Sequence, residues 1–202
     1  SPAEFIPIAE SSGKISHITE WVLEQAIQDT PRIVNAFNEQ VKVSINLSAL
    51  DIKRPALINT IKQLSKRYIA KPANIEFEVT ESAYLENFED AGVFLGELRD
   101  AGYSIALDDF GTGYSSLGYL TKIPIHTLKI DKQFVDEVEL SEQSTMVTTT
   151  IIQMAKQLNL TICAEGVETK QQKKFLIKQG CHQLQGYLFA KPKSLQEILK
   201  SI

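Results

Sequence analysis

The chain has 202 residues, of which 43% are hydrophobic and 23% charged, so it is long enough for a globular domain and is not disordered. Its net charge of −4 and pI near 5.5 argue against binding of a long nucleic acid through a basic face but are compatible with a small anion held through metal ions. Two cysteines are too few for a disulfide framework, and no apolar stretch is long enough to span a bilayer. We therefore expect a cytoplasmic domain without membrane contact, whose parent protein could still be membrane-anchored.

Helical and strand periodicities alternate along the chain. Strand-like alternation is expected at residues 41–47, 75–80, 105–107, 128–130, 161–165 and 183–189. Helical spacing is expected at 15–26 with an end near Pro31, at 57–68, at 91–98, at 147–158, before Gly180 and at 195–202. This alternation predicts an α/β domain with parallel strands, either an open doubly wound sheet or a β/α barrel. No linker or repeat interrupts the chain, so we expect a single domain over residues 1–202.

Each of the six expected strands carries a polar residue near its carboxyl end, on the face opposite its apolar residues. These residues are Asn46, Glu78, Asp108, Lys129 (with Asp131), Glu165 and Gln185. In a β/α barrel the inward face at this end of the strands forms the active site. Each residue alone has an ordinary explanation, such as a turn cap, a solvated carboxylate or a structural ion pair. Their shared position on six strands favours one convergent polar site.

The ligand chemistry of this set is that of hard oxygens. It contains carboxylates and an amide, and the three histidines (His17, His126 and His182) lie outside it, which suits Mg²⁺ or Mn²⁺ better than zinc. Neighbouring carboxylates such as Asp108 and Asp109 repel each other unless a cation offsets their charge. Two metal ions would do so and would support attack on a phosphodiester. We expect Asp108 to bridge the ions and Asp109 to reach in from the start of the following loop.

Seven segments carry a resemblance to a known family. They are FIPIAE (5–10), NLS (46–48), EVTES (78–82), DDFGTGYSSL (108–117), LKID (128–131), AEGVET (164–169) and QGYLFAKP (185–192). In this order and at these intervals they resemble the EAL family of cyclic di-GMP phosphodiesterases. The resemblance implies a modified TIM-like β/α barrel whose first strand is antiparallel. It also implies hydrolysis of one phosphodiester bond of cyclic di-GMP to linear pGpG.

The resemblance assigns roles to individual residues. Asn46, Glu78 and Asp108 would be metal ligands, and Asp109 would help to hold the second of two Mg²⁺ or Mn²⁺ ions. Lys129 and Gln185 would position the attacking water, Glu165 would be a metal ligand or base, and Asp131 would support the site. Glu81 would anchor the glycine-rich loop after Asp109, which in this family couples the site to a homodimer interface.

The sequence departs from the family in one respect. The Glu-Ala-Leu run, usually within Glu-x-Leu-x-Arg, supplies a metal ligand and a phosphate contact in the family, and it is absent here. Six expected strands against the eight of a closed barrel predict an N-terminally incomplete domain, missing its first two strands. Such a chain could be weak or inactive and could self-associate at its open edge. Three hypotheses stay open: a phosphodiesterase in a parent protein with a sensor or GGDEF domain, a cyclic di-GMP receptor without turnover, and a metalloenzyme for another phosphoester.

Overall fold

A computed structural model of the chain describes residues 1–86, 88–111, 117–139 and 142–200. The chain divides into two compact units. The first comprises Ser1–Ile105 together with the end of the chain from Leu199, and the second comprises Ala106–Ile198. The assignment of residues 1–202 to one domain stays a prediction. Among the described helices, none combines the length and apolar character needed to cross a bilayer.

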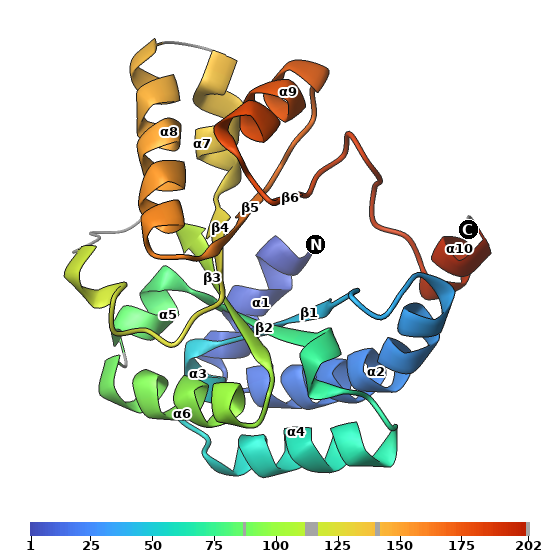
Figure 1. Cartoon of the computed structure of the whole chain (residues 1–202). Coiled ribbons are helices and arrows are strands. Elements are labelled where there is room, and N and C mark those ends of the chain that lie inside the picture. The colour runs from blue at the N-terminus through green and yellow to red at the C-terminus, as the bar shows by residue number, and fades with distance from the viewer. Residues whose placement is uncertain (87, 112–116, 140–141, 201–202) are drawn as a thin grey trace. The chain divides into compact units, whose positions relative to one another are not determined.

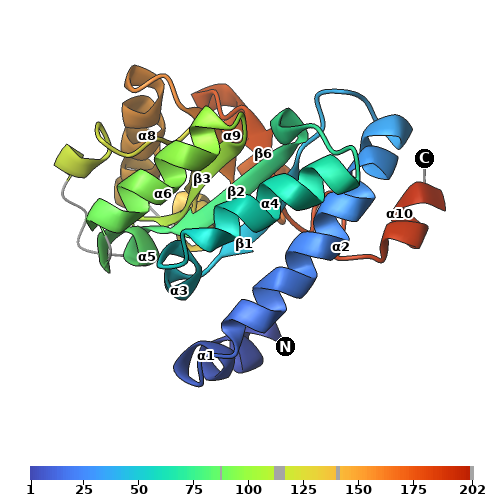
Figure 2. The same cartoon turned by 90° about the horizontal axis from the view of Figure 1, so that it is seen from below.

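The first unit packs helices against a pair of parallel strands. Its elements are α1 (Pro2–Ser11), α2 (Ile15–Ala36), β1 (Val43–Leu47), α3 (Ala49–Ile52), α4 (Ala56–Arg67), η1 (Pro72–Asn74), β2 (Ile75–Thr80), α5 (Glu81–Glu86) and α6 (Phe88–Asp100). Helix α4 lies alongside both α2 and α6 (Figures 1 and 2). Leu23, Ile27, Ile61 and Leu95 on these helices are fully buried, as are Ile45 and Phe77 on the strands. Burial of these side chains supplies the main stabilisation of the unit.

The second unit is built on a run of parallel strands. Its elements are β3 (Ser104–Phe110, which begins at the end of the first unit), η2 (Leu117–Tyr119), β4 (Thr127–Ile130), α7 (Lys132–Asp136), η3 (Glu137–Glu139), α8 (Glu142–Gln157), β5 (Thr161–Ala164), α9 (Lys170–Gln179), β6 (Gln183–Leu184) and, at the end of the chain, α10 (Leu195–Lys200). Strand β3 pairs with β4, β4 with β5 and β5 with β6, all in parallel. Figure 1 shows α7 and α8 side by side.

The alternation of strand residues between two faces is confirmed. Ile45 and Leu47 on β1 are buried, whereas Ser44 and Asn46, which precede them in the strand, are exposed. On β4, Leu128 and Ile130 are fully buried and point away from the face that carries Lys129. The six expected strands and the helices between them are all present among the described residues.

Two expected boundaries are wrong. Helix α2 does not end near Pro31 but continues to Ala36 with the proline inside it. Its buried stripe of Leu23, Ile27 and Thr30 holds that turn against the core, which offsets the cost of about 3 kcal/mol for an internal proline. Strand β6 stops at Leu184 rather than near residue 189, because the chain turns at Gly186, whose carbonyl accepts a hydrogen bond from the Phe189 amide at 3.1 Å.

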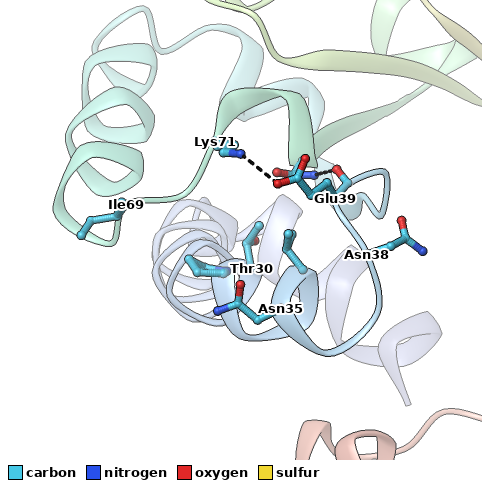
Figure 3. Close-up of a pocket in the computed structure, with 9 residues that line it drawn as sticks. Thr30, Asn35, Asn38, Glu39, Ile69 and Lys71 are labelled. Carbon is cyan, nitrogen blue, oxygen red and sulfur yellow. Dashed lines mark hydrogen bonds and ion pairs between the residues drawn. The ribbon is translucent and has the colours of Figure 1, made fainter. Parts of the chain in front are cut away.

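A pocket of about 370 Å³ in the first unit marks where the chain passes from α2 into β1. Figure 3 shows Thr30 and Asn35 of α2 on one side of it and the ion pair between Lys71 and Glu39 above them. The connection is fixed mainly by Asn74, which is 4% exposed and whose side-chain amide donates to the carbonyls of Glu39 and Val41, both at 2.8 Å. One buried amide therefore satisfies two backbone acceptors at the start of β1.

Replacing Asn74 tests this connection. Asn74→Ala leaves both carbonyls without their donor, so we expect the free energy of unfolding to fall by about 2–4 kcal/mol in urea denaturation. Asn59→Ala, at an exposed position of α4, is the matched control and should leave stability within about 0.5 kcal/mol of the wild type. Equal effects of the two substitutions would contradict the assignment.

Candidate active site

A β-bulge places the two adjacent aspartates of β3 opposite a single residue of β4. Leu107 pairs with Leu128 and Phe110 with Ile130, so Asp108 and Asp109 together lie opposite Lys129. Asp109 takes a left-handed backbone conformation with a φ of 53°. In a regular strand, neighbouring side chains point to opposite faces, but a bulge redirects one of them. The expected location of Asp109 at the start of the following loop is therefore wrong, because Asp109 belongs to β3. Its carboxylate nevertheless lies close to that of Asp108.

Lys129 lies between two carboxylates. Its ammonium nitrogen is 3.1 Å from Oδ1 of Asp108 and 2.8 Å from Oε1 of Glu165, and its side chain is only 5% exposed. Lys129 pairs with Cys163 on β5, so Glu165, two residues further along, has the same parity as Lys129. The Glu165 amide continues the ladder by donating to the Ile130 carbonyl at 3.1 Å. The two carboxylate partners offset the free-energy cost of removing the Lys129 ammonium from water, a cost that an isolated buried ammonium would bear in full.

Three carboxylates gather around this lysine. One oxygen each from Asp108, Asp109 and Glu165 lies within 4.8 Å of the others. The pKa of the Asp109 carboxyl is raised above its ordinary value, first by burial and then by the negative charges of Asp108 and Asp131. The cluster thus holds more negative charge than Lys129 neutralises, and its ligands are hard oxygens with no histidine. This donor set fits a divalent cation of the Mg²⁺ type.

Asp131 borders the cluster and also begins a helix. Its Oδ1 accepts a hydrogen bond from the Gln133 amide at 2.8 Å, which makes it the N-cap of α7. Its charge also acts on Asp109. Asp131 is therefore held in place by the helix start while its carboxylate adds to the negative potential of the site.

Gln185 follows β6 and is fixed through its backbone. Its amide donates to the Ala164 carbonyl at 2.9 Å, and its carbonyl accepts from the Val167 amide at 2.9 Å. The side chain of Gln185 is exposed. The adjacent Gly186 permits this connection, because a Cβ there would lie 2.3 Å from backbone atoms of Val167.

The first unit brings together Asn46 and Glu78. They are direct partners in the register of β1 and β2, with Asn46 exposed and Glu78 6% exposed. Side chains paired across parallel strands share one face, so the amide and the carboxylate point the same way. Their convergence with the cluster of the second unit on one site stays a prediction.

Polar residues that follow these strands start the next helices. After Asn46, the hydroxyl of Ser48 caps α3 and donates to Asp51, which is fully buried and also accepts from Thr19 of α2 at 2.8 Å. After Glu78, Oγ1 of Thr80 accepts from the Ala83 amide at 3.2 Å, at the start of α5. These caps fix the ends of β1 and β2 and so fix the direction of the residues before them.

Glu81 is the first residue of α5 and is 1% exposed. The loop that it is expected to anchor includes residues 112–116, which lie outside the described residues. Its role as a loop anchor stays a prediction.

Sequence reasoning did not single out Gly166, which directly follows Glu165 and lies against Lys132. Gly166 has a φ of 65°, and a Cβ there would lie 2.3 Å from Cγ of Lys132. The Lys132 ammonium in turn bridges Asp136 at 3.1 Å and Glu168 at 2.8 Å. The glycine directly after Glu165 in the segment AEGVET could have indicated a close approach of this kind, because glycine lacks a Cβ.

The carboxylates and the lysine lie at the carboxyl ends of parallel strands, which is where enzymes of the β/α class have their active sites. The comparisons make this class specific. The family model for the EAL domain matches residues 1–192, and the chain belongs to this family. The fold is accordingly an α/β fold related to the TIM barrel.

Curated relatives cover the whole chain. It is 36% identical over 202 residues to the bifunctional diguanylate cyclase/cyclic di-GMP phosphodiesterase MucR of Pseudomonas aeruginosa, covering 100% of this chain and 30% of MucR. It is 37% identical over 202 residues to the probable cyclic di-GMP phosphodiesterase PdeG of Escherichia coli, covering 100% of this chain and 40% of PdeG. The chain thus spans less than half the length of these relatives.

Solved structures agree with this assignment. A structure of the PaMucR phosphodiesterase in complex with c-di-GMP matches with a TM-score of 0.93 and 36% identity, over 98% of this chain and 80% of that one. The EAL enzyme Bd1971, in a form with cAMP and cyclic di-GMP bound, matches with a TM-score of 0.95 and 34% identity, over 100% of this chain and 56% of that one.

Neutralising Asp109 tests the charge balance of the cluster. Because the pKa of Asp109 is raised in the folded protein, ionisation of its carboxyl lowers the free energy of unfolding. This loss of stability is absent below the ordinary pKa of aspartate and is complete once the pH has risen through the raised value. We expect Asp109→Asn to raise the Tm of EDTA-treated protein at about pH 7.5, and the gain to vanish in acid. Added Mg²⁺ should stabilise the wild type more than the variant.

Asp100→Asn, at an exposed site at the end of α6, is the control and should leave the Tm nearly unchanged in both conditions. A lower Tm for Asp109→Asn near neutral pH would show that Asp109 stabilises the metal-free protein and would contradict the charge balance described here.

Proposed function

We propose that this domain hydrolyses one phosphodiester bond of cyclic di-GMP to give linear pGpG. The observation that carries the proposal is the cluster of Asp108, Asp109 and Glu165 around Lys129, at the ends of parallel strands. Membership of the EAL family and the names of MucR and PdeG supply the substrate.

The proposal includes two Mg²⁺ or Mn²⁺ ions. Asn46, Glu78 and Asp108 would bind them, with Asp109 at the second ion and Glu165 as a further ligand. The register pairing of Asn46 with Glu78 and the closeness of the three carboxylates support this assignment. When bound, the ions would neutralise the cluster and lower the pKa of a coordinated water.

The remaining residues would position the reactants. Lys129 already lies within hydrogen-bond distance of two carboxylates, so it is placed to orient a water between them or to stabilise charge on the phosphate. Glu165 would accept the proton of the attacking water. Gln185 would hold that water from the end of β6, and Asp131 would support the arrangement through Asp109.

A second candidate function is that of a cyclic di-GMP receptor without turnover. One observation supports it: the chain matches a structure of the PaMucR phosphodiesterase in complex with c-di-GMP, a form with the nucleotide bound. The two functions share the binding site. They differ in whether the site has all the metal ligands that hydrolysis requires.

The test is incubation of the protein with cyclic di-GMP and Mg²⁺, followed by chromatography for pGpG. We expect metal-dependent turnover that EDTA abolishes, and we expect Asp108→Ala to lower it by at least about 100-fold, because a central ligand is lost. Glu97→Gln, on the exposed face of α6, is the control and should keep full activity.

Binding of cyclic di-GMP without pGpG would establish the receptor instead. Turnover that persists undiminished in Asp108→Ala would overturn the role of the cluster. Absence of any cyclic di-GMP binding by calorimetry would leave a metalloenzyme for another phosphoester.

The proposal extends to assembly. We infer a homodimer within a parent protein that carries a sensor or GGDEF domain. The name of MucR, a bifunctional diguanylate cyclase/cyclic di-GMP phosphodiesterase of which this chain covers 30%, supports a further domain. Exposed apolar side chains on α8, Met146 at 62% and Val147 at 43%, support a contact with a second copy.

Self-association can be measured directly. We expect light scattering to show a dimer whose fraction grows with concentration, and Met146→Lys to shift it toward the monomer by placing a charge in the contact. Lys156→Gln, exposed near the end of the same helix, should not shift it. A wild-type monomer at every concentration would rule the dimer out.

A further inference from the structure

The charge of the chain is distributed unevenly. Residues 169–196 contain six lysines and no aspartate or glutamate. The whole chain has 21 basic and 25 acidic residues, so the rest of the sequence carries ten more acidic than basic side chains. A strongly basic segment in an acidic protein suggests that the segment meets an anionic partner.

Helix α9 presents most of these lysines on one face. Lys170, Lys173, Lys174 and Ile177 follow the spacing of i, i+3, i+4 and i+7, which places them on the same side of a helix. The opposite side holds Gln172 and Leu176, both buried. The helix is well fixed, because Thr169 and Gln172 form a capping box at its start and Gly180 ends it in a left-handed conformation.

The turn after β6 forms a second wall facing this stripe. Lys170, Lys173, Lys174 and Ile177 line a depression of about 540 Å³ together with Leu188 and Phe189, and we call these six residues the basic groove. The turn is held by the close approach of Gly186 to Val167 and by a hydrogen bond from the Leu188 amide to the Val167 carbonyl at 3.0 Å. Figure 1 shows α9 in the second unit, with the chain running on through β6.

Apolar surface lies between the charges. Ile177 on α9 is 55% exposed, and Phe189 in the turn after β6 is 49% exposed. The ammonium of Lys173 is 5.3 Å from the centre of the Phe189 ring, a cation–π distance that holds this lysine over the groove. The basic groove thus combines three ammonium groups with an aliphatic and aromatic surface.

Nearby carboxylates do not neutralise this surface. Among the described residues, no carboxylate lies within 4.0 Å of the ammonium of Lys170, Lys173 or Lys174. Glu168, just before the helix, is an ion-pair partner of Lys132. The positive potential of the groove is therefore available to a ligand.

We propose that the basic groove binds an acidic segment of a partner protein, through an apolar side chain seated between Ile177, Leu188 and Phe189. The stripe from Lys170 to Ile177 is about 10 Å long, which matches about three residues of an extended peptide. A flat lipid surface fits less well, because the apolar side chains line a depression rather than project from it. Acidic residues on both sides of one apolar anchor match the three lysines around an apolar floor. This binding is independent of phosphodiester hydrolysis.

The probe is a fluorescein-labelled seven-residue peptide of aspartate and glutamate with one central phenylalanine, measured by fluorescence anisotropy against the full chain. We expect saturable binding that weakens with salt. Lys173→Glu combined with Lys174→Glu should weaken it at least about 10-fold, and Phe189→Ser should also weaken it. Lys62→Glu combined with Lys66→Glu, on the exposed face of α4, makes the same charge change elsewhere and should leave the affinity unchanged.

Three results would overturn the proposal. One is equal weakening by the α4 double variant, which would mean a non-specific charge effect. Another is unchanged affinity when serine replaces the phenylalanine of the peptide, which would remove the apolar anchor. The third is binding to phosphatidylglycerol vesicles, lost in Lys173→Glu/Lys174→Glu, without binding of the peptide, which would assign the groove to a lipid surface. Circular dichroism of each variant confirms that it is folded.

Discussion

The candidate site depends on one buried ammonium group. Lys129 is almost fully enclosed, and two carboxylates contact it. Asp108 lies on β3, and Glu165 directly follows β5, the strand on the other side of β4. Removing a charge from water costs several kcal/mol, and each member of this set is stable there only because of the others. The lysine does not balance the cluster, since Asp109 and Asp131 add further negative charge. This excess is the physical reason to expect a divalent cation.

The same local arrangement of strand end and helix cap recurs around the site. A parallel strand ends, a polar side chain points from its face, and a hydroxyl or carboxylate within a few residues caps the next helix. Ser48 after β1, Thr80 at the end of β2 and Asp131 after β4 all follow this pattern. The segments that identify the family therefore specify folding as well as chemistry, because a cap that starts the helix also fixes the strand end before it.

The periodicity of the sequence predicted the strands and the facing of their side chains, because burial of one strand face makes apolar residues recur at every second position. Ile45, Leu128 and their counterparts are buried, and Lys129 and Glu165 share a face as expected. The bulge at Asp109 could not be predicted this way, since one extra residue in the register changes the facing of a side chain without changing the hydrophobic pattern. The continuation of α2 through Pro31 was also not predicted, because burial of the helix against the core outweighed the low helix propensity of proline. The turn at Gly186 depends on a close approach to Val167, a contact between distant residues that spacing does not encode.

The central claim is that the carboxylates around Lys129 are a metal site. The most direct measurement is a crystal structure of the protein grown with Mn²⁺, with anomalous differences collected to locate the ion. The account predicts a peak about 2.1 Å from carboxylate oxygens of Asp108 and its neighbours. A protein saturated with Mn²⁺ whose anomalous peaks all lie elsewhere, with Lys129 still bridging Asp108 and Glu165, would show that the cluster is a structural ion-pair network and would contradict the account.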